Sequence, residues 1–166
     1  MVVSNGMEQK TSPKDVFLHL LSILTLYTSG VAFLVLVFQY VNILFPDILE
    51  GGYYALTGAR AAIRWSIASL IVVFPVYIFT TWHLNKAYDR NPSQRNLRIR
   101  KWLVYFTLFA AALIIIGDLV TLINRLLEGE LTARFILKVL AVFFVAGSTF
   151  WYYISDLKRH KIDSHA

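Results

Sequence analysis

The residue with the clearest chemical potential is Asp118, an acidic side chain within the apolar segment formed by residues 114–120. An ionised residue at the centre of a bilayer costs about 2.5–3.5 kcal/mol on insertion scales, and more by other estimates. Because Asp118 follows Trp102 by sixteen residues, a helix would carry it about 24 Å from that end of the segment. We therefore expect Asp118 to pair with a cation, to be protonated, or to contact water.

Basic residues near the ends of two other apolar segments are candidate partners of Asp118. Arg64 lies near the start of the second segment and Lys138 near the start of the fourth, at comparable predicted depth. Residues three or four positions apart share one face of a helix. This spacing groups Arg134 with Lys138, and it groups Thr121 and Arg125 with Asp118. The predicted charge cluster, which is also the predicted path for an ion or polar solute, comprises Asp118, Arg64, Lys138, Thr121, Arg125 and Arg134.

Two hypotheses explain this charge cluster. In the first, Asp118 pairs with Arg64 or Lys138 and locks the helices together, because a buried charge without a partner is costly. In the second, the charged groups line a polar vestibule through which an ion, a proton or a polar solute moves, because ionisable residues inside membranes often mark such paths. The sequence leaves both hypotheses open.

The sequence does not indicate an enzyme. It contains no arrangement of nucleophile and base, no metal-ligand spacing and no glycine-rich phosphate loop, so we predict no catalytic residue, no metal site and no cofactor. The absence of cysteine excludes thiolate chemistry. His19 and His83 are expected near the same membrane surface, but the second histidine pair that would suggest haem ligation within the bundle is missing.

The elements that must position these residues follow from composition. Hydrophobic residues make up 57% of the 166 residues and charged residues 16%, whereas soluble domains have about 45–50% and about 25%. A membrane-spanning helix needs about 20 apolar residues, and four segments meet this requirement: residues 16–45, 61–82, 102–126 and 133–154. The predicted fold is all-α, a bundle of four transmembrane helices in residues 13–159. Flexible segments are predicted at residues 1–12 and 160–166.

Local signals mark the ends of these segments. Ser12 followed by Pro13 is typical of a helix start, with a capping hydroxyl and a proline in the first turn. Pro46 ends the first segment, because proline cannot continue the backbone hydrogen bonds of a helix. Gly129 separates the last two segments, and Thr132 is a predicted N-cap of the fourth.

Two further features concern packing within the spans. Pro75 falls in the middle of the second segment and predicts a helix kink. Ser22, Thr25 and Ser29 share one face of the first segment, and small residues on a membrane helix favour close approach of a neighbouring helix.

The distribution of Lys and Arg predicts the orientation. The N-terminal segment carries two of these residues, the loop at residues 86–101 carries six and the C-terminal segment three, compared with five on the opposite side. The positive-inside rule therefore places this loop and both termini in the cytoplasm. This orientation accounts for the net charge of +6, and we predict no nucleic-acid partner, because no basic motif interleaved with aromatic residues is present.

Several segments together resemble an uncharacterised bacterial family of four-span membrane proteins, known only as a domain of unknown function. The segments that carry the resemblance are residues 62–69, 116–123, 130–140 and 150–153, and the similarity extends over residues 13–159. The resemblance implies the same topology and a location in the bacterial inner membrane. It implies no activity, substrate or cofactor.

These observations lead to one functional expectation and one alternative. We expect a small oligomeric membrane protein that acts as a channel or transport component for an ion or small polar solute, with a charged outer vestibule. Four helices pack around a core that side chains fill, so a pore would require a homo-oligomer arranged around an axis. The alternative is a non-catalytic structural or accessory membrane protein whose intramembrane charges only lock helix packing. The lipid bilayer is an expected partner in both cases, and no soluble partner is indicated.

Overall fold

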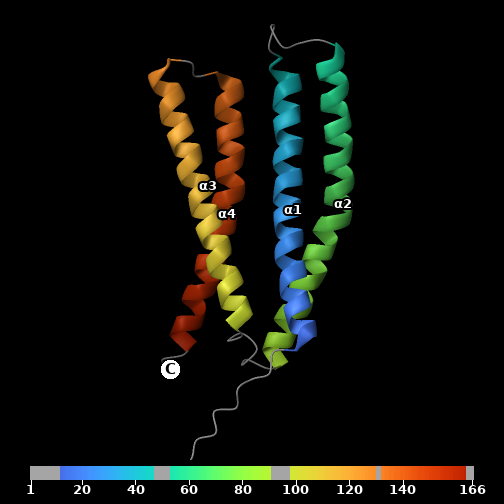
Figure 1. Ribbon diagram of the computed structural model, residues 1–166, viewed down its shortest axis with the longest axis vertical. Coiled ribbons are helices and arrows are strands. Elements are labelled where there is room, and N and C mark those ends of the chain that lie inside the picture. The colour runs from blue at the N-terminus through green and yellow to red at the C-terminus, as the bar shows by residue number, and fades with distance from the viewer. Residues whose placement is uncertain (1–11, 47–52, 91–97, 130–131, 164–166) are drawn as a thin grey trace, which may run out of the picture.

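The computed structural model describes residues 12–46, 53–90, 98–129 and 132–163 of the chain. These residues form four helices, which run up and down in order (Figure 1): α1 Pro13–Leu44, α2 Tyr53–Arg90, α3 Arg98–Leu127 and α4 Ala133–Asp163. Each helix contains a segment long and apolar enough to cross a membrane. The prediction of a four-helix integral membrane protein is therefore confirmed.

The predicted helix boundaries rest on local interactions that the structure contains. The Ser12 hydroxyl accepts a hydrogen bond from the backbone N–H of Lys14 at 3.3 Å, and Pro13 is the first helical residue of α1. Gly129 ends α3 with φ of 73°, a left-handed conformation that glycine adopts without steric penalty. The Thr132 hydroxyl accepts from the N–H of Phe135 at 3.2 Å and caps α4.

Helices α2, α3 and α4 extend beyond the predicted apolar segments at the termini end, where α3 begins at Arg98 rather than at residue 102. Helix α2 continues to Arg90 and α4 continues to Asp163, beyond the segments predicted to end at residues 82 and 154. The extensions are polar, which is why hydropathy did not find them. Helix α4 thus continues into residues 160–163 of the segment that we predicted as a flexible tail. Residues 1–11 and 164–166, which make up most of the two predicted flexible segments, lie outside the described residues.

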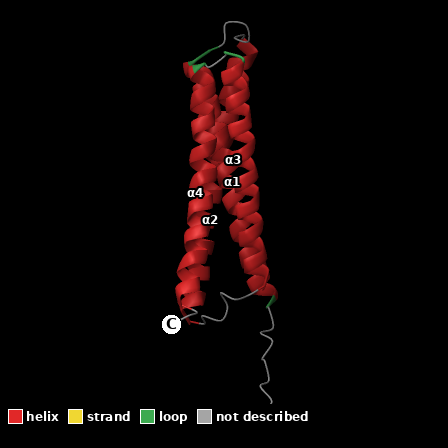
Figure 2. Cartoon of the chain, turned by 90° about the vertical axis from the view of Figure 1, so that its left-hand side faces the viewer, coloured by secondary structure: helices red, strands yellow, loops and turns green. Residues whose placement is uncertain are grey.

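The helices form two hairpins, α1 with α2 and α3 with α4. Helix α1 also packs against α4 and α3, whereas α2 makes no close backbone contact with α3 or α4 over the described residues. Figure 1 shows the hairpins side by side, with α3 crossing α4 along its length, and Figure 2 shows the same bundle from the side. We call the end where α1 begins and α4 finishes the termini end, and the opposite end the hairpin end.

Small and hydroxyl-bearing side chains form the buried seam of α1. Ser22, Thr25 and Ser29 are all buried, as the shared helix face predicted. The Ser22 hydroxyl lies 3.3 Å from the hydroxyl of Thr81 on α2. On the other side of α1, a Cβ built on Gly30 would lie 3.4 Å from a side-chain carbon of Val145 on α4, so α1 and α4 also approach closely here.

Most of the remaining surface is apolar and exposed, as expected for a protein solvated by lipid. Three tryptophans near the termini end, Trp82, Trp102 and Trp151, are 57%, 62% and 74% exposed, which suits interfacial anchors. Pro75 lies inside α2, which stays helical through it. Figure 1 shows that α2 changes direction about halfway along, the region in which the kink was predicted.

Candidate functional site

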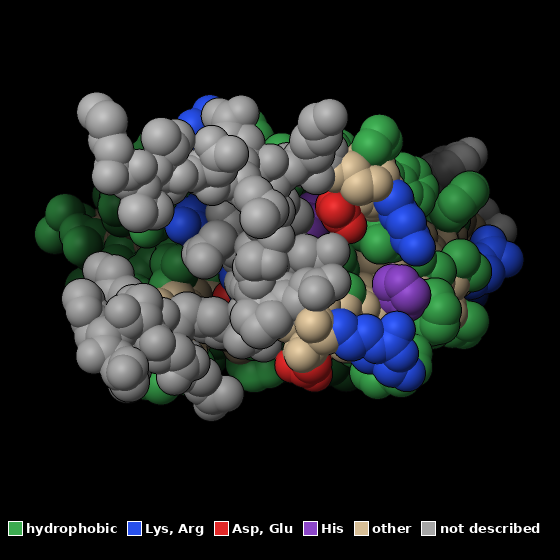
Figure 3. Space-filling model, turned by 90° about the horizontal axis from the view of Figure 1, so that it is seen from below, with side chains coloured by type: hydrophobic (Ala, Val, Ile, Leu, Met, Phe, Trp, Pro, Cys, Tyr) green, Lys and Arg blue, Asp and Glu red, His purple; other side chains and the backbone are tan. Residues whose placement is uncertain are grey.

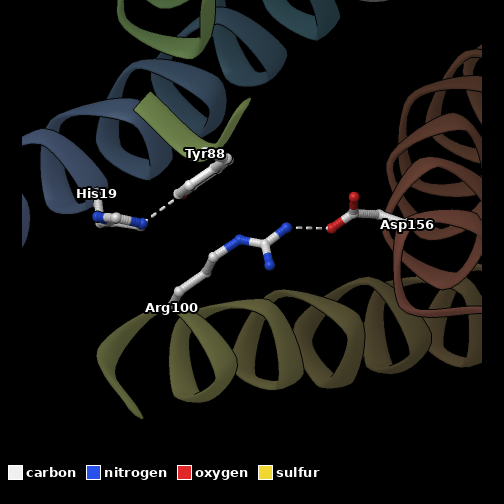
Figure 4. Close-up of polar contacts among 4 residues, drawn as sticks. All are labelled: His19, Tyr88, Arg100 and Asp156. Atoms are coloured by element: carbon white, nitrogen blue, oxygen red, sulfur yellow. Dashed lines mark hydrogen bonds and ion pairs between the residues drawn. The ribbon is translucent and has the colours of Figure 1, made fainter. Parts of the chain in front are cut away.

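A polar cluster at the termini end takes one residue from each of the four helices (Figure 4): His19 of α1, Tyr88 of α2, Arg100 of α3 and Asp156 of α4. His19 Nε2 lies 2.5 Å from the Tyr88 hydroxyl, and Arg100 donates to Asp156 Oδ2 at 2.5 Å. The Arg100 guanidinium carbon lies 4.9 Å from the centre of the Tyr88 ring. These contacts link the two hairpins, although α2 has no close backbone contact with α3 or α4.

The hydrogen bonds of His19 define which of its ring nitrogens carries the hydrogen. Nδ1 lies 2.6 Å from the backbone carbonyl of Asp15, which can only accept, so Nδ1 carries a hydrogen and donates. In the neutral ring Nε2 is then an acceptor, and the Tyr88 hydroxyl donates to it. Protonation of His19 would turn Nε2 into a donor and reverse this bond, so the pair can take up a proton without losing contact.

Arg100 and Asp156 form an ion pair that is mostly shielded from solvent. Their side chains are 16% and 28% exposed. The guanidinium also faces the Tyr88 ring at a distance typical of cation–π contacts. Arg100 therefore contacts two helices at once: it forms an ion pair with Asp156 of α4 and a cation–π contact with Tyr88 of α2.

A half-open cavity of about 60 Å³ adjoins this cluster. One water molecule needs about 10–15 Å³, so the cavity has room for a few waters or a small ion but not for a metabolite. Its lining is rich in hydroxyl, amide, imidazole and charged groups. The polar residues that line it are His19, Ser22, Tyr77, Thr81, Asn85, Tyr88, Arg100, Tyr152, Tyr153 and Asp156.

A second cavity, of about 100 Å³, lies further along the bundle between α1, α3 and α4 and is almost entirely apolar. It is lined by α3 at Thr107, Ala111 and Ile114, whereas α3 contributes Arg100, Leu103 and Val104 to the polar cavity. The two cavities therefore follow each other along one side of α3.

A buried hydrogen bond lies at the boundary of the two cavities. The Tyr27 hydroxyl of α1 donates to the Thr107 hydroxyl at 3.1 Å, and Thr107 donates to the carbonyl of Leu103 at 2.9 Å. Thr107 is 1% exposed, so both of its hydrogen-bonding roles are filled within the protein. This bond joins α1 to α3 within their apolar spans.

Asp118 continues the same face of α3 beyond the apolar cavity. It follows Thr107, Ala111 and Ile114 at steps of four, three and four residues, the spacing of one helix face. Its side chain is half-buried, and one carboxylate oxygen, Oδ2, is buried without a hydrogen-bond partner in the described residues. Arg100, Thr107 and Asp118 thus form an interrupted polar line along α3.

The ion pair predicted for Asp118 is not formed among the described residues. Arg64 is exposed and lies on α2, a helix without close backbone contact to α3. Lys138 instead places its ammonium group 5.5 Å from the centre of the Phe38 ring on α1. Arg134, one turn before Lys138, donates from Nε to Asn42 of α1 at 3.0 Å. The prediction was wrong because α4 presents its cations to α1, which hydropathy and charge alone do not reveal.

Two other members of the predicted charge cluster add little to a site. Thr121 is exposed and donates to the carbonyl of Gly117 in its own helix at 2.8 Å. The side chain of Arg125 lies outside the described residues. In the part of the chain that the structure describes, Lys138 and Arg134 thus contact α1 rather than Asp118.

His19 and His83, the two histidines of the described spans, each contact a different aromatic residue. His83 stacks on Phe79 within α2, and His19 uses Nε2 for Tyr88. No group of three His, Asp or Glu residues suited to a metal is found in the part of the chain that the structure describes. Figure 3 looks onto the termini end and shows Lys, Arg and His side chains gathered there.

Sequence reasoning missed the four-helix cluster for an identifiable reason. Tyr88, Arg100 and Asp156 lie beyond the predicted ends of their spans, where they resemble ordinary residues of the membrane surface. Only the helical extensions show that they point into the bundle. One signal was available: Arg100 precedes Leu103, Val104 and Thr107 at the spacing of a buried helix face.

Residues 15–153 match a protein family described as a domain of unknown function, DUF5671. The chain belongs to this family, and the resemblance on which the sequence analysis relied is confirmed. No curated protein and no solved structure shows a significant match to the chain.

Proposed function

We propose that this protein is a membrane transport component for protons or small ions, with a path that follows one face of α3. The observation that carries the proposal is the line formed by Arg100, Thr107 and Asp118 beside two successive cavities. At 1.5 Å per residue, these three positions are about 10 Å and about 16 Å apart along the helix. The line thus extends over most of the membrane thickness of about 30 Å.

The polar cavity is the entrance of this path. Its volume fits water-sized species, and the His19–Tyr88 pair can accept a proton and change its hydrogen-bond direction. Arg100 and Asp156 keep opposite charges together at the entrance, which limits the cost of a passing charge.

The apolar cavity acts as the gate in this proposal. Hydrophobic constrictions block ions when they are dry and conduct when they are wetted. The Tyr27–Thr107 hydrogen bond separates the polar cavity from the apolar one, and Asp118 offers a carboxylate beyond it. Wetting of the cavity would connect these groups into one path.

Orientation and assembly belong to the same proposal. The concentration of Lys and Arg at the termini end supports a cytoplasmic location of the polar cavity and of both termini, in the inner membrane. A homo-oligomer is supported by α2, whose backbone closely approaches only α1 among the described helices and whose exposed outer surface is left to lipid or to another copy. No covalent reaction is part of the proposed function.

A flux measurement tests the proposal. The purified protein is reconstituted into liposomes that contain a pH-sensitive dye, and proton entry is driven by a potassium diffusion potential. We expect flux in the wild type and at least about a tenfold reduction in Asp118→Asn, since a carboxylate on the path would be lost. Thr121→Val, an exposed residue one turn further along, serves as the matched control. Flux equal to that of empty liposomes, with protons and with sodium, potassium or chloride, would reject the transport proposal.

The second candidate is a structural or accessory membrane protein. It is favoured by the number of side-chain contacts that join the helices, such as Arg100 with Asp156 and Arg134 with Asn42, all of which could serve packing alone. In that case variants that remove these contacts would lower thermal stability, and the wild type itself would show no flux in liposomes.

A further inference from the structure

The apolar cavity continues toward the hairpin end as a seam between α1 and α4. Val142 of α4 and Leu34 of α1 both line the cavity. Four residues further along on each helix, Lys138 lies over the ring of Phe38. The cavity and the cation therefore lie along the same pair of helix faces.

A second cation lies one turn further along the seam. Arg134 donates to Asn42, at the next step of four residues on both helices. The rise of 1.5 Å per residue places Lys138 about 6 Å and Arg134 about 12 Å beyond Val142. The seam is thus apolar at its inner end and positively charged at its outer end.

This order matches the chemistry of a phospholipid. The cavity offers almost only apolar surface at mid-membrane depth, with about 100 Å³ of space and a side open to the surroundings. Arg and Lys bind phosphate oxygens through charge-assisted hydrogen bonds, and basic sites between membrane helices bind lipid head groups. A single lipid can satisfy both ends, because its phosphate and its acyl chain are covalently joined along the membrane normal.

We propose that the seam between α1 and α4 binds one anionic phospholipid, with an acyl chain in the apolar cavity and its phosphate at Arg134 and Lys138. The lipid comes from the leaflet at the hairpin end, because both cations lie in the first turns of α4. Asn42 and Phe38 then hold the two cations in place for the head group.

Bound lipid would also occupy the gate of the proposed path, so regulation of flux by the lipid rests on the proposed function. The binding itself does not. Lipid binding can therefore be detected even if no flux is measured, and flux can be measured even if no lipid binds.

Native mass spectrometry of the full chain in mild detergent tests the proposal, with added dioleoyl phosphatidylglycerol as the probe. We expect one tightly bound lipid per chain in the wild type. Glycerol 3-phosphate, which lacks the chains, and dioleoylglycerol, which lacks the phosphate, should each bind at least about tenfold more weakly. Equal binding of either fragment would overturn the proposal, because the site would then recognise only one end of the lipid.

Two sets of variants locate the site. Ala146→Leu fills the cavity and the double variant Arg134→Gln/Lys138→Gln removes the cations, and each should weaken lipid binding about tenfold. The matched controls are Ala68→Leu and Arg60→Gln, exposed positions of α2 away from the seam, which should bind as the wild type. Val142→Phe replaces Ala146→Leu if that variant fails to fold. Unchanged binding in either seam variant, or equal losses in the controls, would overturn the proposal.

Discussion

The guanidinium of Arg100 lies 4.9 Å from the ring centre of Tyr88, and this contact joins two hairpins through helices whose backbones do not approach each other. Arg100 also binds Asp156 within its own hairpin. The termini end of the bundle is therefore held by one arginine with two different partners. A substitution of Arg100 should therefore weaken contacts in both hairpins, so it tests how much this end of the protein contributes to stability.

Replacement of Arg100 by Gln should lower the free energy of unfolding by about 1–3 kcal/mol, because Asp156 would lose a charge-assisted hydrogen bond in a shielded place. Thermal unfolding in mild detergent measures the loss. Lys86→Gln is the control, since the ammonium group of Lys86 lies over the exposed ring of Trp82 in its own helix, and its loss should change stability by less than about 0.5 kcal/mol.

A double-mutant cycle of Arg100→Gln and Tyr88→Leu should show a coupling of about 0.5–2 kcal/mol, the range of a cation–π contact that is partly desolvated. Tyr88→Phe separates the ring from the hydroxyl, because it keeps the contact with Arg100 and removes the bond to His19. Additive losses for Arg100 and Tyr88 would show that the contact between the hairpins contributes no energy.

Replacement of Thr107 by Val should destabilise the protein by about 1–3 kcal/mol, since the shape is kept and the Tyr27 hydroxyl loses its buried acceptor. Thr121→Val is matched in chemistry and helix, but Thr121 is exposed and bonds only within its own helix, so its effect should be close to zero. Thermal unfolding of both variants compares them. Equal losses would mean that the Tyr27–Thr107 bond does not contribute.

The sequence was sufficient to predict the fold and insufficient to predict the site, for physical reasons. Each helix is specified by its own residues: apolar length, Ser12 and Thr132 as caps, and Gly129 as a left-handed end. These signals are local and need no partner. The choice between α1 and α3 as the neighbour of the cations on α4 depends on how the hairpins cross, which no local signal encodes.

Asp118 illustrates the same distinction. Its burial cost could be estimated from the sequence, which predicted that Asp118 is paired, protonated or in contact with water, and its Oδ2 is buried without a hydrogen-bond partner among the described residues. The partner of Asp118 was predicted only from its depth in the membrane, and residues at equal depth on different helices cannot be distinguished in this way. Arg64 satisfied the depth requirement but lies on α2, the one described helix whose backbone does not approach that of α3.

Topology can be tested with a single cysteine, because the chain has none of its own. Ser93→Cys lies in the segment of residues 86–101, which carries six basic residues, and we expect it to resist a membrane-impermeant thiol reagent added to intact cells. Gly51→Cys, between the first two helices, is the opposite-side control and should be labelled. Labelling of Ser93→Cys without permeabilisation would reverse the orientation.

The assembly state can be measured directly by the particle mass in nanodiscs and in mild detergent. A homo-oligomer is expected, because the backbone of α2 approaches only that of α1 among the described helices and the bundle of one chain of 19.0 kDa encloses little volume. A strictly monomeric particle under both conditions would contradict this prediction. The sequence alone led us to expect a pore only between copies, whereas the path proposed along α3 lies within one chain, so the flux measurement tests that path independently of the particle mass.

The test that best separates packing from transport is a comparison of Asp118 with Asp156. Asp156 is bound by Arg100, so Asp156→Asn should lower the midpoint of thermal unfolding, Tm. Asp118 has a buried oxygen that finds no partner in the described part of the chain, so Asp118→Asn should leave Tm unchanged or raise it, and its effect should add to that of Arg64→Gln. If Asp118 lies on a path, the same stable variant should lose at least about nine-tenths of the proton flux in liposomes. A lowered Tm with non-additive coupling to Arg64 would instead restore the ion-pair lock, because stabilisation would then be the reason for a carboxylate at this depth.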